Sequence, residues 1–268
     1  MIVRSDREED AAPFDDPTSP QSLALDWLLN DTIALSEDGV TATVLQRYAL
    51  AVLYYSTDGP NWKEQLNFLS ESDACSWHGG LIKQDDDGDG FGTGLNCHPH
   101  IILHVNEGGL NGTLPWELSL FSDLYFLKMD ENALFGTLPT ELGRLSGLYV
   151  LNVGNNSFTG TLPTELGSLT MLDELAVDRN NLIGTLPTEL GRLTDIRSIF
   201  LYENDFTGTI PTELGLWTAL EGFFASKNNF SGSLPMETID QWKNIKALAF
   251  NNNGLSGTLP TELGTWTA

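Results

Sequence analysis

The residues best suited to metal chemistry lie in a short acidic stretch, DDDGDG, at residues 85–90. Asp85, Asp87 and Asp89 alternate and Gly90 follows them, as in the first half of a calcium-binding loop, where alternate carboxylates coordinate the ion and glycine permits a sharp turn. The second half differs, because Asn96 stands where the last glutamate ligand should be and no helical pattern flanks the loop. The stretch therefore predicts a solvated acidic insertion, with weak calcium binding as the alternative.

Four histidines also lie close together in the sequence, and histidine is a common zinc ligand. They are His78, His98, His100 and His104. No acidic residue or thiol stands beside them at a spacing typical of a metal site, so we predict no metal centre here. The sequence also contains no phosphate-binding glycine loop, nucleophile elbow, zinc-protease helix or kinase motif. We therefore expect no catalytic residues, no cofactor apart from the weak calcium alternative, and no enzymatic activity.

The charge balance narrows the classes of partner. The 268 residues include 13 Lys and Arg against 37 Asp and Glu, which gives a formal net charge of −24. Such a chain repels nucleic acids and anionic membrane surfaces. The longest apolar run, YALAVLYY at residues 48–55, is shorter than the roughly 20 residues that span a bilayer. We expect no nucleic-acid partner and no membrane segment within this chain.

A phrase related to GTLPTELG recurs along the chain, and the elements that it forms must position any site. Its first glycine recurs at steps of 24 residues, with a last step of 25, at Gly112, Gly136, Gly160, Gly184, Gly208, Gly232 and Gly257. The pattern L-x-x-L-x-L-x-x-N precedes the glycines, for example from Leu124 to Asn132. A fixed period of about 20–29 residues, with Leu and Asn at set offsets, is typical of a leucine-rich repeat solenoid.

Each position of the repeat has a physical role. The apolar residues point inward from a short strand and are buried only when neighbouring coils stack on them. An asparagine stands where the chain turns away from the strand, and its amide can pair backbone groups that the turn would leave without partners. These asparagines are Asn132, Asn156, Asn180, Asn204, Asn228 and Asn253. Glycine permits the next bend, proline ends the strand pairing, and Thr before Glu, as in Thr140-Glu141, is predicted to cap a short helical turn.

The segment NALFGTLPTELGRL at residues 132–145 resembles the plant-type leucine-rich repeat of plant receptor ectodomains and polygalacturonase inhibitors. The resemblance implies an α/β solenoid. This is a right-handed superhelix with a parallel β-sheet on its concave face, a second, smaller set of strands, and short 3-10 or helical turns on its convex side. We expect seven repeats over residues 99–268, the last of them incomplete. Gly108 replaces the asparagine of the first repeat, and a one-residue insertion lies between Pro235 and Ile245.

The residues before the repeats predict an acidic disordered leader over residues 1–18 and a helical N-terminal cap over residues 19–98. Two helices are expected, in SPQSLALDWLLND at residues 19–31 and in TATVLQRYALAVLYYSTDG at residues 41–59. Each has a start signal, Ser19-Pro20 or Thr41, before apolar residues at helical spacing. Such a cap would close the apolar end of the solenoid.

The rest of the cap contains Trp62, Cys75, Trp77 and Cys97. This arrangement resembles the cap of plant-type repeats and most resembles the repeat proteins of diatoms and related algae. The resemblance implies a disulfide between Cys75 and Cys97, with two buried free thiols as the alternative. A disulfide in turn implies a secretory compartment.

Glycosylation sequons agree with an extracellular or cell-surface location. They begin at Asn30, Asn111, Asn155 and Asn229. We expect the protein to be tethered through sequence outside this chain, with a signal or membrane anchor before Met1 and further repeats after Ala268.

Ligand recognition is expected on the concave face, where the variable positions of the strand pattern project into solvent. Phe200, Tyr202 and Phe224 are predicted to form an aromatic cluster there. Exposed aromatic side chains beside arginine are enriched at binding hot spots. The same predicted site includes the cations Lys128, Arg179 and Lys227. The alternative is that the rings only cover one another.

Together these features favour a recognition module that binds a protein or peptide, as the ectodomain of a membrane-tethered receptor-like or adhesive protein. Two alternatives stay open because a fold by itself does not determine function. One is an inhibitor of a cell-wall polysaccharide hydrolase, implied by the resemblance to the plant inhibitors, so that the partner could be associated with polysaccharide. The other is a structural component of a wall or matrix.

Overall fold

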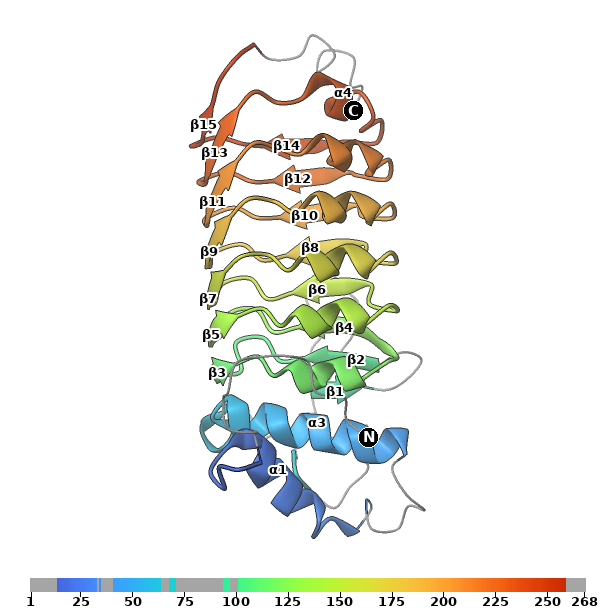
Figure 1. The fold of residues 1–268 in the computed structure, drawn as a ribbon, viewed down its shortest axis with the longest axis vertical. Helices are drawn as coiled ribbons and strands as arrows, with labels where there is room; N and C mark the ends of the chain where they lie inside the picture. The colour runs from blue at the N-terminus through green and yellow to red at the C-terminus, as the bar shows by residue number, and fades with distance from the viewer. Residues whose placement is uncertain are drawn as a thin grey trace.

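The computed structural model describes residues 14–32, 34, 41–63, 68–70, 94–96 and 101–258. These residues form a curved stack of coils with helices packed across one end (Figure 1). A typical coil contributes one strand to a first sheet, one strand to a second sheet and one short helix to the opposite side. The predicted solenoid is therefore confirmed.

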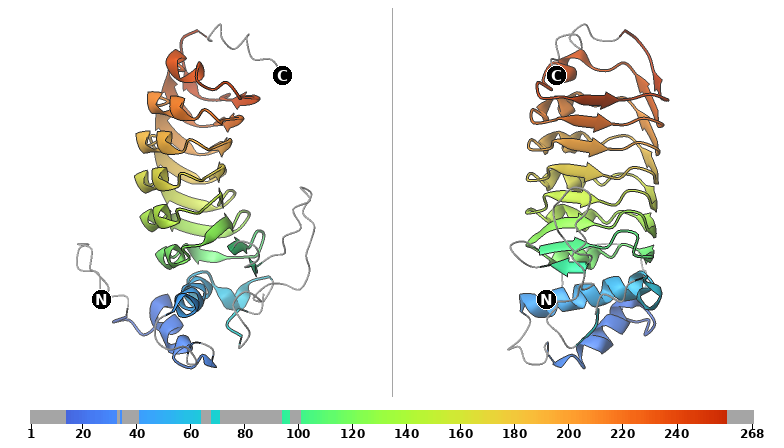
Figure 2. Two further views of the ribbon diagram at one scale, coloured as in Figure 1. Left: turned by 90° about the vertical axis from the view of Figure 1, so that its right-hand side faces the viewer. Right: turned by 180° about the vertical axis from the view of Figure 1, so that it is seen from behind.

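The first sheet has eight strands in the order β1-β2-β4-β6-β8-β10-β12-β14. They are β1 (Gly94–Asn96), β2 (Ile101–His104), β4 (Leu124–Lys128), β6 (Val150–Asn152), β8 (Glu174–Ala176), β10 (Ser198–Phe200), β12 (Gly222–Phe224) and β14 (Ala247–Ala249). Neighbouring strands are parallel, except for β1 and β2, which are antiparallel. This sheet lines the concave side of the curve (Figure 2).

The second sheet has seven strands in the order β15-β13-β11-β9-β7-β5-β3. They are β3 (Asn111–Thr113), β5 (Ala133–Thr137), β7 (Ser157–Gly160), β9 (Asn181–Gly184), β11 (Asp205–Gly208), β13 (Asn229–Gly232) and β15 (Gly254–Leu255). The recurrent glycine lies in these strands from β3 to β13, and Gly257 follows β15; Gly160, for example, has a φ of 79°. Only glycine adopts this conformation at little cost, which explains its place in the repeat.

Short 3-10 helices cover the convex side. They are η3 (Trp116–Leu120), η4 (Thr140–Arg144), η5 (Thr164–Ser168), η6 (Thr188–Arg192) and η7 (Thr212–Leu216); the coil with the one-residue insertion has an α-helical turn instead, α4 (Met236–Ile239). The prediction that Thr140 caps such a helix is wrong. Pro139 occupies the cap position in extended conformation, so Thr140 is already helical, and its hydroxyl pairs with Glu141 Oε2 at 3.2 Å.

The apolar strand positions form one continuous core. Equivalent residues of successive coils, Leu127, Leu151, Leu175, Ile199 and Phe223, are all fully buried. Each coil covers the apolar edge of the one before it, as expected for a solenoid.

The asparagine column is a hydrogen-bonded ladder, as predicted. Asn180 Oδ1 accepts from the Phe158 amide at 2.9 Å, and its Nδ2 donates to the carbonyls of Val153 and Val177, both at 3.1 Å. The other asparagines make equivalent bonds, from Asn132 to Asn253. Each side chain thus ties its own turn to the preceding coil.

The N-terminal cap contains α1 (Pro20–Leu28), α3 (Ala42–Ser56) and η1 (Gly59–Asn61). Both predicted start signals are confirmed. Ser19 Oγ accepts from the Ser22 amide at 3.1 Å, and Thr41 Oγ1 accepts from the Val44 amide at 3.3 Å. These bonds satisfy amides that a helix leaves unpaired in its first turn.

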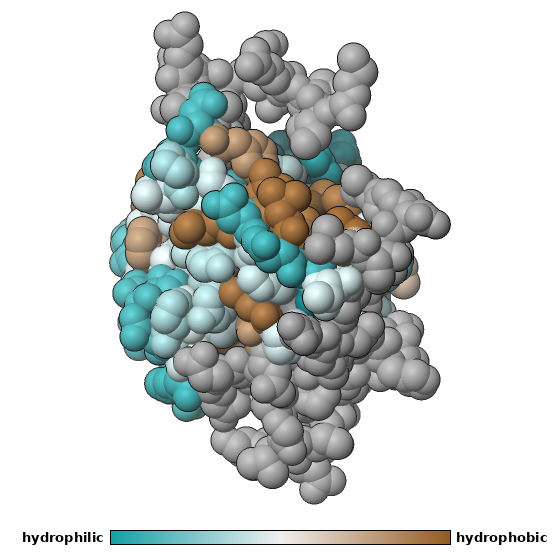
Figure 3. Space-filling view, turned by 90° about the horizontal axis from the view of Figure 1, so that it is seen from below, coloured by the Kyte–Doolittle hydropathy of each residue, from teal (hydrophilic) through white to brown (hydrophobic). Residues whose placement is uncertain are grey.

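Helix α3 closes the end of the solenoid. Its Leu50 and Leu53 belong to the same apolar core as Leu103 of β2. On its other side the fully buried Arg47 forms an ion pair with Asp31. The outer face of the cap is less well covered: Figure 3, seen from the cap end, shows apolar side chains gathered among polar ones. The exposed large apolar side chains in and beside α1 are Phe14, Leu23, Leu25 and Leu29.

Candidate ligand-binding site on the concave face

The aromatic residues predicted for the site meet on the concave face. The rings of Phe200 and Phe224, in adjacent strands β10 and β12, stack with their centroids 4.9 Å apart and an interplanar angle of 3°. Both side chains are half-buried, because each ring covers one face of the other. The pair therefore forms a partly exposed apolar shelf, which combines the predicted cluster with the alternative that the rings cover one another.

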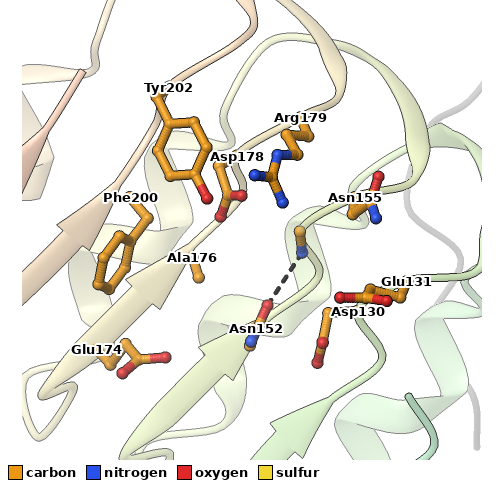
Figure 4. Close-up of a pocket in the computed structure, with 11 residues that line it drawn as sticks. Asp130, Glu131, Asn152, Asn155, Glu174, Ala176, Asp178, Arg179, Phe200 and Tyr202 are labelled. Carbon is orange, nitrogen blue, oxygen red and sulfur yellow. Dashed lines mark hydrogen bonds between the residues drawn. The ribbon is translucent and has the colours of Figure 1, made fainter. Parts of the chain in front are cut away.

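A hollow of about 270 Å³ lies beside this shelf, toward the cap (Figure 4). It is lined by Asp130, Glu131, Asn152, Gly154, Asn155, Glu174, Ala176, Asp178, Arg179, Phe200 and Tyr202. Gly154 and Ala176 are small, whereas the equivalent positions of the next coils hold Asp178 and Phe200. The hollow exists because these two side chains leave space between larger neighbours.

Tyr202 is fixed at one wall of the hollow. Its hydroxyl points toward Asp178 (Figure 4) and donates a hydrogen bond to that carboxylate. The guanidinium of Arg179 lies 5.3 Å from the centre of the Tyr202 ring, a distance typical of a cation–π contact. Burial, together with the hydrogen bond to Asp178, raises the pKa of Tyr202 to about 12. The hydroxyl therefore keeps its proton and its donor role at neutral pH.

The remaining wall of the hollow is acidic. Burial raises the pKa of Asp178 and of Asp130, and for Asp130 the charges of Glu131 and Asp178 act in the same direction. Arg179 Nε lies 3.7 Å from Oε2 of Glu203, and Lys227 Nζ lies 2.6 Å from Oε1 of the same carboxylate. Within the described part of the chain, no salt bridge reaches Asp130 or Glu131.

A second row of side chains runs along the other edge of the same sheet. Tyr125 and Tyr149 stack with ring centroids 5.0 Å apart, and Tyr149 is hydrogen-bonded to Asp173. Asp173 then pairs with Arg197 at 3.4 Å, and in the following coils Glu221 pairs with Lys246 at 2.6 Å. Several charges along this edge are thus paired with one another.

Comparisons with known proteins support the fold. The family model described as Leucine Rich Repeat matches residues 147–169, one full period of the repeat. The ectodomain of the plant receptor kinase GASSHO1/SCHENGEN3 from Arabidopsis thaliana, solved with CASPARIAN STRIP INTEGRITY FACTOR 2, is similar over 84% of this chain and 28% of that chain, with 27% identity and a TM-score of 0.63. Its repeats and fold are those of plant-type leucine-rich repeat proteins.

Two further solved structures support the similarity of this chain to leucine-rich repeat proteins. The plant peptide hormone receptor RGFR1, in complex with RGF2, is 32% identical over 60% of this chain and 26% of that chain, with a TM-score of 0.59. Pollen Receptor Kinase 3 is 29% identical over 71% of this chain and 91% of that chain, with a TM-score of 0.58. The leucine-rich repeat protein therefore spans about a quarter of the length of the first two receptors. A comparison with curated protein sequences gives no significant match.

The leucine-rich repeat protein brings some of the predicted site residues together and separates others. Arg179, Phe200 and Tyr202 line the hollow, and Phe224 stacks behind Phe200. Lys227 lies beyond the hollow in its ion pair with Glu203. Lys128 is also outside the lining, with its ammonium group 5.7 Å from the centre of the Phe126 ring.

The sequence-based prediction missed the acidic side of the hollow. Asp130, Glu174 and Asp178 all contribute to the lining, as does the gap at Gly154. The signal was present, since Asp130, Gly154 and Asp178 occupy the same position in consecutive repeats. The prediction considered only aromatic and cationic residues at that position and therefore overlooked the carboxylates.

Other predicted residues are placed as follows. The sequon residues Asn30, Asn111, Asn155 and Asn229 all have exposed side chains. The predicted disulfide residues Cys75 and Cys97 and the calcium candidates Asp85, Asp87 and Asp89 lie outside the described residues. Within the described ranges, no helix has the length and apolar character needed to cross a membrane.

Proposed function

We propose that this leucine-rich repeat protein is a recognition module that binds a peptide along its concave face. The observation that carries the proposal is the hollow beside the stacked Phe200–Phe224 pair on the solvent-facing side of the first sheet. A concave site with an apolar wall and a few fixed polar groups is the usual form of a ligand site. The similarity to RGFR1, a peptide hormone receptor, supports a peptide as the ligand class.

We further propose an extracellular role, as the ectodomain of a receptor-like or adhesive protein tethered through sequence outside this chain. The exposed sequon residues Asn111 and Asn229, both in strands of the second sheet, support this location because glycans there would stand clear of the concave face. Asn155, by contrast, lines the hollow. The same similarity to receptor ectodomains supports a binding role.

Selection from a random peptide library tests the proposal. Peptides selected on the wild-type protein should lose roughly 1–3 kcal/mol of binding free energy when Tyr202 is replaced by Ala, because Tyr202 supplies both an aromatic surface and the hydrogen bond that orients Asp178. Isothermal titration calorimetry on the resynthesised peptides measures this loss.

The matched control is Glu213→Ala on the exposed convex helix η7. It should leave the affinity unchanged. Equal losses from the Tyr202 and Glu213 variants, or a library that yields no binder sensitive to Tyr202, would contradict a concave peptide site.

A further inference from the structure

The hollow contains a notch whose position is set by Gly154. Asp130, Gly154 and Asp178 occupy equivalent places in three successive coils, as the hydrogen bonds from Glu131 N to Gly154 O and from Asn155 N to Asp178 O show. A Cβ atom on Gly154 would lie 2.9 Å from Asp178 Oδ1. The Asp178 carboxylate therefore leans over Gly154, and Asp130 and Asp178 both border this part of the hollow. Their backbones lie about 10 Å apart, because neighbouring strands are about 4.8 Å apart.

The notch is negatively charged, and its charged side chains are held in place by neighbouring residues. Asp178 is 8% exposed and is fixed by the hydrogen bond from Tyr202. The nearest cation of the lining, Arg179, is engaged by Glu203 and by the face of Tyr202. Burial of the two carboxylates is costly, which is why the pKa values of Asp130 and Asp178 rise although Lys128 and Arg179 oppose the rise. A positive group between them would offset that cost.

The shape of the notch favours an organic cation over a metal ion. In the part of the chain that the structure describes, no three His, Cys, Asp or Glu side chains stand close enough together to hold a metal. A guanidinium or ammonium group at the end of a flexible stem can reach separated carboxylates, and its methylene groups can lie against Tyr202 and Phe200. The notch thus combines an acidic end with an apolar wall.

We propose that the peptide recognised on the concave face carries a cationic side chain, arginine or lysine, that inserts at Gly154 between Asp130 and Asp178. This inference rests on the proposed function and specifies its ligand. The same peptide places an apolar side chain on the Phe200–Phe224 shelf.

The geometry sets the spacing of these two residues in the peptide. The Phe200–Phe224 shelf lies two to three strands beyond Gly154. Neighbouring strands are about 4.8 Å apart, so the distance from Gly154 to the shelf is about 12 Å. A peptide extended along the solenoid advances about 3.3 Å per residue. The cation and the apolar residue should therefore be separated by about three or four positions.

The test uses the synthetic peptide acetyl-Arg-Gly-Gly-Gly-Phe-amide and its citrulline counterpart, which has the same shape without the charge. Binding to the protein is followed by the chemical shifts of its backbone amides in NMR titrations. The arginine peptide should bind about tenfold more tightly than the citrulline peptide, as expected for one charge-assisted pair. Asp178→Asn and Asp130→Asn should each reduce this ratio toward one, and Gly154→Leu should weaken both peptides by filling the notch.

The matched control is Glu189→Gln, a carboxylate of the convex helix η6, which should leave the ratio unchanged. Circular dichroism melting checks that each variant is folded. Equal binding of the two peptides, absence of binding by both, or an unchanged ratio in the Asp178 and Asp130 variants would overturn the inference. Failure of the proposed function is distinguished from these outcomes, because in that case the random library yields no peptide whose binding depends on Tyr202.

Discussion

Asn180 and Asn181 are adjacent in the sequence and have different structural roles. Asn180 is 8% exposed and pairs four backbone groups, the Phe158 amide and the carbonyls of Val153, Val177 and Asp178. Asn181 begins strand β9 with its side chain in solvent. The repeat thus separates residues that hold the coil from residues that are free to vary.

Replacing Asn180 with Ala should lower the free energy of unfolding by about 3 kcal/mol, because each buried backbone group left without a partner costs about 1–3 kcal/mol. Asn181→Ala should change it by less than about 0.5 kcal/mol, as is usual for an exposed position. Urea denaturation of both variants measures the difference. Similar values for the two would show that the ladder contributes little to stability.

The sequence predicted this column but only part of the binding site. The asparagines recur at a fixed offset, so their role follows from the period alone. The hollow depends on side-chain size across three coils, at Asp130, Gly154 and Asp178, and on the stacking that leaves Phe200 half-buried. These relations exist only once the coils are stacked, and a search for aromatic and cationic residues did not reveal them.

Among the elements, the convex helices approach one another closely at a glycine. A Cβ atom on Gly167 in η5 would lie 2.3 Å from the backbone carbonyl oxygen of Glu189 in η6. Gly143 and Gly191 meet the next coil in the same way. The glycine of TELG is therefore required by coil stacking, and larger residues would force the helices apart.

Gly167→Ala should lower the free energy of unfolding by about 1–3 kcal/mol, the range for overpacking a close contact. Gly147→Ala is the matched control, since the nearest atom to its Cβ would be Ser122 O at 3.9 Å. It should be neutral or slightly stabilising, because alanine reduces the freedom of the unfolded chain. Thermal melting compares the two. Equal destabilisation would argue against close stacking at the convex glycine.

The interface between the cap and the first coil contains a buried carboxylate. Glu117 of η3 is fully buried; its Oε1 accepts from Gln21 Nε2 of α1 at 3.0 Å, and its Oε2 has no hydrogen-bond partner among the described groups. Burial raises the pKa of Glu117, which the bond from Gln21 only partly offsets. The folded protein therefore binds a proton at this site more tightly than the unfolded chain does.

Stability should consequently fall as the pH rises from the ordinary range of a glutamate through the raised pKa of Glu117, because ionisation is more costly in the folded state. Glu117→Gln should remove this part of the pH dependence and raise stability at neutral pH. Glu165→Gln, at the equivalent position two coils further along, is the control and should leave the dependence unchanged. Denaturation curves recorded over a pH series test this. A Glu117 variant with the slope of the wild type would contradict it.

At the level of elements, the period of the repeat predicted the inward-facing strands, the core and the ladder, and the resemblance to plant-type repeats predicted the second sheet. Two details were not predicted. Thr140 lies one residue too late to cap its helix because Pro139 takes that place, and the insertion before Ile245 converts a 3-10 helix into α4. Both depend on local backbone conformation rather than on the pattern of apolar residues.

The whole molecule combines a rigid curved scaffold with a strong negative charge. The net charge of −24 should speed the approach of cationic ligands and make association weaker at high salt. Charges at both edges of the first sheet are paired, such as Arg197 with Asp173 and Lys227 with Glu203, whereas Asp130 and Glu131 of the hollow have no salt bridge within the described residues. Long-range attraction and local recognition therefore act at the same face.

The most direct test of the central claim is an NMR map of a library-selected peptide on the protein. We predict that the amide signals of residues 152–155, 176–179 and 200–203, around the hollow, shift on titration, while those of the convex helices η5 and η6 stay in place. Shifts confined to the convex helices or to the second sheet, with the residues of the hollow unaffected, would contradict a peptide site on the concave face.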